Sequence, residues 1–287
     1  DDAGYGHYIF SRLPRLSATR IASVCDFLSD SGAQISDDYT RWIRDETRDD
    51  AWRLRAACVL AHFEPEAEVF QDEQVREFLA TKLTELFPSE LLPVREMFLP
   101  IAPDLSGTLR AIYQDRDQSE ESRSYAAESW VFFNQDSPEK LCDFLLLCEA
   151  RQFPLVMQAL EGQDQLQSEL ASLEIMSSAK VIDRERHDIR KANAAIVLFQ
   201  LGQEHLVWPL LKYSSTPQVR SYIIHWLHAK GCDVGPLVAR LATEEDEGIS
   251  NAIMLALGEF PRSAFTEEQL ASIANLSAAR RSVDSAA

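Results

Sequence analysis

Three apolar segments of the chain open with a related dipeptide, and the dipeptide recurs every thirty residues: Ile189-Arg190, Val219-Arg220 and Ile249-Ser250. A turn rich in Asp, Glu, Ser, Thr or Pro comes just before each of them. A repeat of this length is typical of stacked helix pairs, because one pair is too small to bury its own apolar face. The period therefore predicts an α-solenoid.

The composition agrees with an all-α chain. Apolar residues make up 46% of the 287 residues, which is enough for a continuous core, and there are only 10 glycines. Runs of alternating β-branched residues are also few, so a sheet-rich fold is disfavoured. We therefore expect an all-α solenoid of stacked antiparallel helix pairs, whose core grows in one dimension.

The apolar pattern divides the chain into four parts. We expect an irregular lead-in, degenerate N-terminal helical repeats, a polar loop between repeats, and C-terminal repeats, over residues 1–16, 17–160, 161–187 and 188–287 respectively. Leu166, Leu170 and Leu173 could form a short amphipathic helix inside the loop. The chain lacks an initiating Met, and residues 278–287 resemble the start of a further unit, so we expect a truncated fragment.

Helices are predicted wherever apolar residues recur at helical spacing. Their expected ranges are 16–28, 38–46, 52–63, 72–87, 90–99, 104–113, 120–133, 138–148, 153–160, 189–201, 204–213, 219–229, 234–242, 249–257 and 266–276. Gly202, Gly231 and Gly258 follow three of these ranges. We expect them just past helix ends, at least two with positive φ, because glycine adopts the left-handed conformation at little cost.

The repeat also predicts which side chains meet. Ala194, Ala195, Val197 and Leu198 should face inward beside Ile223, Ile224 and Leu227. Arg190 and Arg220 occupy equivalent repeat positions, and we expect them to pair with acidic residues of the adjacent turn; capture of a ligand is the alternative.

With these anchors in place, the chain resembles HEAT repeats. Such repeats carry a Pro near the first helix, a polar turn, and then a Val-Arg pair followed by an apolar run. Pro209-Leu210-Leu211 followed by Thr216-Pro217-Gln218-Val219-Arg220 fits this pattern. Pro236-Leu237-Val238 followed by Asp246-Glu247-Gly248-Ile249-Ser250 fits except that Ser250 replaces Arg. The resemblance implies a HEAT-like α-solenoid.

Residues 187–260 are similar to something narrower, the HEAT segments of large bacterial multidomain proteins. Some of these join a Ser/Thr kinase domain to a formylglycine-generating-enzyme-like domain. The segments that carry the similarity are Ala192–Ala195, Val207–Leu211 and Val219–His225. The chain has no Gly-rich phosphate loop with its Lys, no H-R-D motif and no formylglycine-generating site, so those activities do not carry over. The resemblance implies a linker or regulatory scaffold.

The charge narrows the set of partners. Asp and Glu number 46 against 28 Lys and Arg, which gives a net charge of −18. Such a surface repels phosphate, so we expect neither nucleic-acid binding nor membrane binding. It would attract a protein with a basic surface, or it would only keep a long chain soluble. Five cysteines without a C-x-x-C motif favour a reducing compartment, and we expect the cytoplasm.

Few residues suggest a functional site. The acidic turn Glu244, Glu245, Asp246 and Glu247 could bind an Arg or Lys of a partner or a divalent cation, or it could complement a helix dipole while solvated. His225, His228 and Cys232 offer two imidazoles on one helix face and a nearby thiol, but a fourth zinc ligand is not evident. We therefore expect no metal, no cofactor and no catalytic residues.

The sequence thus favours a non-catalytic scaffold, which would bind another protein or neighbouring domains. The alternative is a regulatory or linker region of a larger bacterial multidomain enzyme, or of a signalling or defence complex, whose catalysis lies elsewhere. The two hypotheses differ in what would flank this sequence, because only the second requires kinase or formylglycine-generating motifs there.

Overall fold

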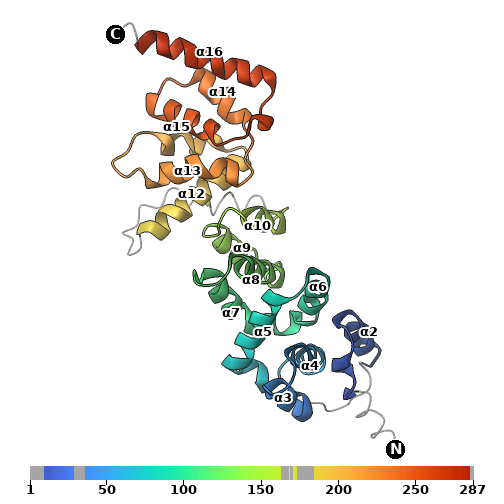
Figure 1. The fold of residues 1–287 in the computed structure, drawn as a ribbon. Helices are drawn as coiled ribbons and strands as arrows, with labels where there is room; N and C mark the ends of the chain where they lie inside the picture. The colour runs from blue at the N-terminus through green and yellow to red at the C-terminus, as the bar shows by residue number, and fades with distance from the viewer. Residues whose placement is uncertain (1–9, 29–35, 163–167, 169–170, 173–183, 285–287) are drawn as a thin grey trace, which may run out of the picture. The chain divides into compact units, whose positions relative to one another are not determined.

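A computed structural model describes residues 10–28, 36–162, 168, 171–172 and 184–284, with the side chains of Ser36 and of residues 277–284 excepted. The described chain is helical throughout and contains no strand, which confirms the all-α prediction. It forms two compact units, Asp1–Asp136 and Ser137–Ala287. Figure 1 shows the helices of each unit. The boundary between the two units lies between Asp136 and Ser137.

The first unit contains seven α-helices among its described residues, together with short 3-10 turns. The helices are α2 (Ala18–Leu28), α3 (Ser36–Arg44), α4 (Asp50–Phe63), α5 (Glu73–Glu85), α6 (Pro88–Met97), α7 (Ala102–Gln114) and α8 (Glu120–Phe133). The 3-10 turns are η1 (Leu13–Arg15), η3 (Glu68–Gln71) and η4 (Leu99–Ile101). Phe10 and Leu13, placed by the sequence in an irregular lead-in, are buried in the core.

The second unit is built in the same way from its described residues. Its α-helices are α9 (Pro138–Leu145), α10 (Phe153–Ala159), α12 (Arg184–Gln200), α13 (Gln218–Ala229), α14 (Gly235–Thr243), α15 (Glu247–Gly258) and α16 (Glu267–Asp284). Its 3-10 turns are η5 (Glu204–Leu206), η6 (Trp208–Leu211) and η7 (Arg262–Ala264).

Local side-chain caps explain where several helices begin. Asp49, Ser119 and Asp246 each accept a hydrogen bond from a main-chain amide in the first turn of α4, α8 and α15. The first-turn amides of a helix have no partner within the helix, so a side-chain acceptor there stabilises the start.

Three helices share one contact: an arginine at the third or fourth helical position donates a hydrogen bond to a carbonyl at the end of the preceding element. Arg53 Nε donates to the Ile43 carbonyl, Arg123 Nε to that of Tyr113, and Arg220 Nε to that of Leu211, each at 2.9 Å. The last carbonyls of a helix lack partners within it, so each arginine satisfies an acceptor that the fold leaves open.

The two arginines singled out from the sequence therefore behave differently. Arg190 pairs with an acid as predicted, but the acid is Asp143 on α9, at 2.7 Å, and not a residue of the adjacent turn. For Arg220 the predicted acidic partner is wrong, because its guanidinium donates to the carbonyls of Leu211 and Gly248. Arg220 Nε lies 2.9 Å from the Leu211 carbonyl at the end of η6, and this carbonyl takes the place of the expected acid.

The predicted inner face is confirmed. α12 packs against α13, and all seven predicted core residues are buried, from Ala194 to Leu198 on one helix and from Ile223 to Leu227 on the other. Gly202 and Gly231 follow their helices with φ of 73° and 80°. Gly258, however, is the last residue of α15 and has no positive φ.

Three other sequence expectations are wrong in detail. The helix predicted over 204–213 is a pair of 3-10 turns, because Pro209 lacks an amide hydrogen and disfavours helical geometry at Trp208. Residues 184–187, predicted as loop, are the first turn of α12, and residues 278–284 continue α16 and do not start a new unit. The short helix predicted from Leu166 to Leu173 lies outside the described residues.

Candidate functional site

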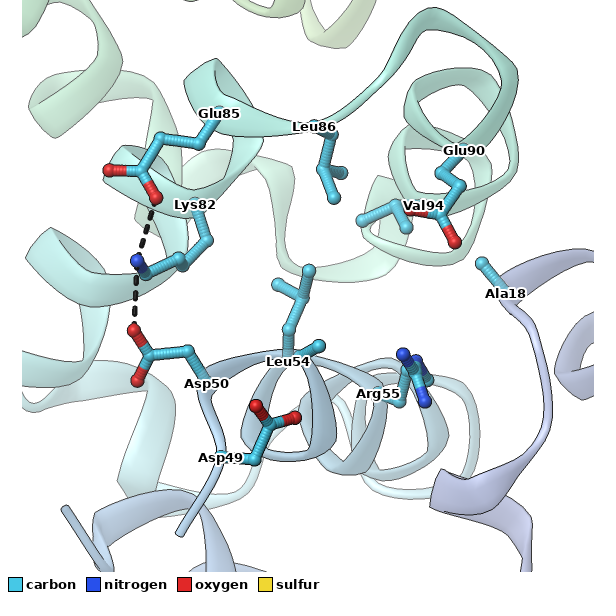
Figure 2. A pocket seen from close by; sticks show the side chains of 11 residues that line it. Ala18, Asp49, Asp50, Leu54, Arg55, Lys82, Glu85, Leu86, Glu90 and Val94 are labelled. Carbon is cyan, nitrogen blue, oxygen red and sulfur yellow. Dashed lines mark hydrogen bonds and ion pairs between the residues drawn. The ribbon is translucent and has the colours of Figure 1, made fainter. Parts of the chain in front are cut away.

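The first unit contains a groove of about 290 Å³ between α2, α4, α5 and α6, shown in Figure 2. Its apolar lining comes from separate parts of the sequence: Ala18 at the start of α2, Leu54 on α4, Leu86 directly after α5, and Val94 on α6. Figure 2 shows Leu54 pointing from α4 toward Leu86. The groove therefore offers an apolar surface at the junction of four helices.

One side of the groove carries a three-membered charge cluster. Lys82 Nζ lies 2.8 Å from Asp50 Oδ2 and 2.7 Å from Glu85 Oε2, as the dashed lines in Figure 2 indicate. The hydrogen bond from Lys82 lowers the pKa of Asp50, and the hydrogen bonds to Asp50 and Glu85 raise the pKa of Lys82. An ammonium group is thus stable between two carboxylates at this groove.

The remaining charges of the groove are less compensated. Arg55 Nη1 donates to the carbonyl of Pro14 at 3.3 Å, and Asp49 caps α4. Neither Asp49 nor Glu90 has an ion-pair partner among the residues that the structure describes. Because the lining contains four carboxylates and two cations, its net charge is negative. An apolar group that carries a positive charge matches this lining.

The acidic turn predicted as a binding site is partly occupied by internal contacts. Glu244 Oε2 accepts hydrogen bonds from Arg240, and Asp246 caps α15 and pairs with Lys212 at 3.2 Å. Burial opposes ionisation of Glu244, but hydrogen bonds from Asp246 N and Arg240 outweigh it and lower its pKa. The amide of Ile249 likewise lowers the pKa of Asp246. Glu245 and Glu247 are exposed, and they are the part of the turn that faces solvent.

The three residues considered as a metal set make separate contacts. His225 Nδ1 lies 2.8 Å from Glu259 Oε1, and the His228 ring packs against Phe260 with centroids 4.9 Å apart. Cys232 is buried. Within the described part of the chain, His, Cys, Asp and Glu nowhere gather in a group of three suited to a metal.

Burial raises the pKa of all five cysteine thiols. The thiolate is the reactive form of cysteine, so these side chains stay protonated at neutral pH and act as apolar core residues.

Sequence reasoning missed one unusual group, the buried Lys230. This residue is 2% exposed, and its Nζ lies over the rings of Phe153 and Trp226, at 4.5 and 5.0 Å from their centroids. Nζ donates to the Cys148 carbonyl at 3.1 Å. Burial lowers the pKa of Lys230 to about 8. Lysines are common near helix C-termini, where they are usually exposed to solvent, so the sequence contained no indication that Lys230 is buried.

A second hollow, of about 350 Å³, lies between α10 and the C-terminal ends of α12 and α13. It is lined by Met157 and Pro154 on α10 and by the Lys230-Gly231 turn, among others. The rings that hold Lys230 Nζ, those of Phe153 and Trp226, do not line it. Lys230 itself lines this hollow, and its ammonium group donates to the Cys148 carbonyl within the same unit.

Comparisons with known proteins give no relative: no family model, no curated protein and no solved structure matches the chain. None of the described helices is both long and apolar enough to span a bilayer.

Proposed function

We propose that the chain is a HEAT-like α-solenoid of stacked antiparallel helix pairs that acts as a non-catalytic cytoplasmic scaffold and binds a protein with a basic surface. The observation that carries the proposal is the net charge of −18 on an all-helical chain, together with a groove whose lining is also net negative. Charge of one sign raises the association rate of a partner of the opposite sign.

The recurring arginine contact supports the repeat architecture. Arg53, Arg123 and Arg220 join consecutive elements through the same donor atom and the same kind of acceptor. A contact that recurs at equivalent positions is expected when the units are variants of one helix pair. The protonated, buried thiols support a role without nucleophilic cysteine chemistry.

The test begins with affinity purification of the protein at low salt and mass spectrometry of what co-elutes. The association rate of the purified partner is then measured at increasing ionic strength. The Debye length falls from about 10 Å at 0.1 M salt to about 3 Å at 1 M, so the rate should fall steeply. A rate that does not change with salt would contradict the proposal, because recognition would then be apolar.

The acidic turn provides a second arm of the test. Glu245→Lys together with Glu247→Lys reverses two exposed charges and leaves in place Glu244 and Asp246, which make internal contacts. If this turn contributes to steering, the double variant should associate more slowly with the basic partner at low salt. Equal rates for wild type and variant would restrict recognition to other acidic surfaces.

A further inference from the structure

The groove between α2, α4, α5 and α6 brings buried apolar groups and charged groups together in one cavity of about 290 Å³. Leu54 and Val94 in its lining are only 4% and 1% exposed, and Ala18 is buried as well, so the core holds most of the apolar lining in place. Ligands bind in cavities of this kind, where apolar walls surround a few polar groups. The groove is therefore preformed for an apolar group.

Two of the four carboxylates at the groove are already compensated. Asp50 pairs with Lys82 at 2.8 Å and with Arg53 at 3.2 Å, and Glu85 pairs with Lys82 at 2.7 Å. These two acids and two bases form a cluster without net charge. A charged ligand therefore gains little from this side of the groove.

The other charged residues of the lining are Asp49, Arg55 and Glu90. Arg55 donates to the Pro14 carbonyl at 3.3 Å, and the Asp49 carboxylate accepts from the Trp52 amide as the cap of α4. The Glu90 carboxylate has neither an ion pair nor a hydrogen bond to any residue that the structure describes. Together the three residues leave one negative charge uncompensated, so the groove is complementary to one cation.

The apolar side chains separate the neutral cluster from this uncompensated carboxylate. In Figure 2, Leu54 and Leu86 lie between Lys82 and Glu90, and Glu90 lies beside Val94. A ligand that covers the two leucines can therefore reach Glu90 with one end. An aliphatic chain that ends in a cation has this form, whereas a neutral chain would leave Glu90 unpaired and an acidic one would be repelled.

We propose that this groove binds one lysine side chain of the partner protein, with the methylene stem on Leu54 and Leu86 and the ammonium group at Glu90. Lysine fits better than arginine, because a guanidinium has five N–H donors and an ammonium has three, and one carboxylate leaves more of the five unsatisfied. This inference rests on the proposed function, and it names the side chain that is recognised and the place where it binds.

The test follows the leucine and valine methyl resonances of the whole protein by NMR, because Leu54, Leu86 and Val94 line the groove. The probe is Nα-acetyl-lysine methylamide, and the norleucine compound is the control with the same stem but no ammonium group. We expect the lysine probe to shift these three residues but not Leu255 on α15, and to bind about fivefold more tightly than norleucine. Equal affinities of the two compounds, tighter binding of the arginine compound, or shifts that spare the groove would overturn the proposal.

Two charge variants locate the ammonium group. Glu90→Gln removes the uncompensated charge, and Asp49→Asn removes the charge of the cap while asparagine still caps α4. Glu73→Gln is the matched control, because Glu73 is exposed and lies in the first turn of α5 as Glu90 lies in that of α6. We expect Glu90→Gln to lower the lysine affinity to that of norleucine, Asp49→Asn to lower it less, and Glu73→Gln to keep it. An unchanged affinity in Glu90→Gln would overturn the proposal.

Binding of the purified partner distinguishes the groove from the proposed scaffold function. If Glu90→Gln binds the basic partner as tightly as wild type does at low salt, the groove is not the recognition site, while the scaffold function stands. If the lysine probe binds in the groove but no co-purified protein shows binding that weakens with salt, the scaffold function is wrong, and so is the assignment of the groove to a protein partner.

Discussion

Lys230 Nζ lies 3.1 Å from the main-chain oxygen of Cys148 and donates to it a hydrogen bond that spans 82 residues of chain. The same ammonium group lies over the rings of Phe153 and Trp226. A cation over aromatic faces is attracted by the ring quadrupole, which partly replaces the water that burial removes. The end of α13 is thereby tied to the segment between α9 and α10.

The first prediction concerns the pH dependence of stability at this lysine. The folded-state pKa of about 8 lies below the ordinary value of 10.5, so between these values the unfolded chain binds more protons at Lys230 than the folded chain does. Stability due to Lys230 should therefore rise with pH across this window. Below about pH 8, burial of the charged form costs the folded state up to about 3 kcal/mol.

The measurement compares wild type with Lys230→Met by urea unfolding at about pH 7 and about pH 9.5. Wild type should gain about 2 kcal/mol relative to the variant over that range. The buried thiols have raised pKa values and act in the opposite direction at high pH, but they are present in both proteins. Because the charge of Lys230 lowers the pKa of Cys148 and Cys232, the difference reports Lys230 together with its coupling to these two thiols. A difference that stays constant with pH would show that the buried amine does not titrate in this range.

The second prediction concerns the arginine contact. Arg220→Ala removes hydrogen bonds to the carbonyls of Leu211 and Gly248, and it leaves the Leu211 carbonyl at the end of η6 without its side-chain donor. We expect a loss of about 1–3 kcal/mol in the free energy of unfolding. Arg262→Ala is the control in the same unit, because Arg262 is 81% exposed and its partner Glu267 is 3.7 Å away. Similar losses in the two variants would contradict a structural role specific to Arg220.

The third prediction compares two glycines of α15. A Cβ at Gly248 would lie 2.8 Å from Tyr213 N, a main-chain atom that cannot move aside cheaply, whereas a Cβ at Gly258 would meet nothing within 4 Å. Gly248→Ala should therefore destabilise the protein by about 1–3 kcal/mol. Gly258→Ala should leave stability unchanged or raise it by up to about 1 kcal/mol. Thermal unfolding of the two variants checks the contrast, and a reversed order would contradict the packing of Tyr213 on α15.

The fourth prediction concerns the core between α12 and α13. Leu198 is fully buried, so Leu198→Ala should cost about 2–5 kcal/mol through lost burial and the cavity that remains. Leu255→Ala, at a position 57% exposed on α15, serves as the control and should change the free energy of unfolding by less than about 0.5 kcal/mol. The measurement is the denaturant midpoint of each variant. Equal midpoints for Leu198→Ala and Leu255→Ala would show that α12 does not pack as described.

Local features were predictable from the sequence because they depend on neighbouring residues. The caps at Asp49 and Ser119 lie within three residues of the amides they satisfy, so α4 and α8 begin within about two residues of the predicted positions. Gly202 and Gly231 likewise end helices through their own backbone freedom. The helix predicted over 204–213 was wrong because the prediction relied on apolar spacing and did not take into account the constraint that Pro209 places on Trp208.

What only the tertiary structure decided depends on residues far apart in the chain. Ala18, Leu54 and Val94 line one groove although none is near another in sequence. Lys230 is buried because aromatic rings and a carbonyl from other segments meet its ammonium group, and nothing in its neighbours signals this. The sequence alone determined an acidic, all-helical chain, because helical periodicity and charge are properties of local composition. The groove and the buried amine could be found only in the folded structure, because both depend on contacts between residues that are far apart in the sequence.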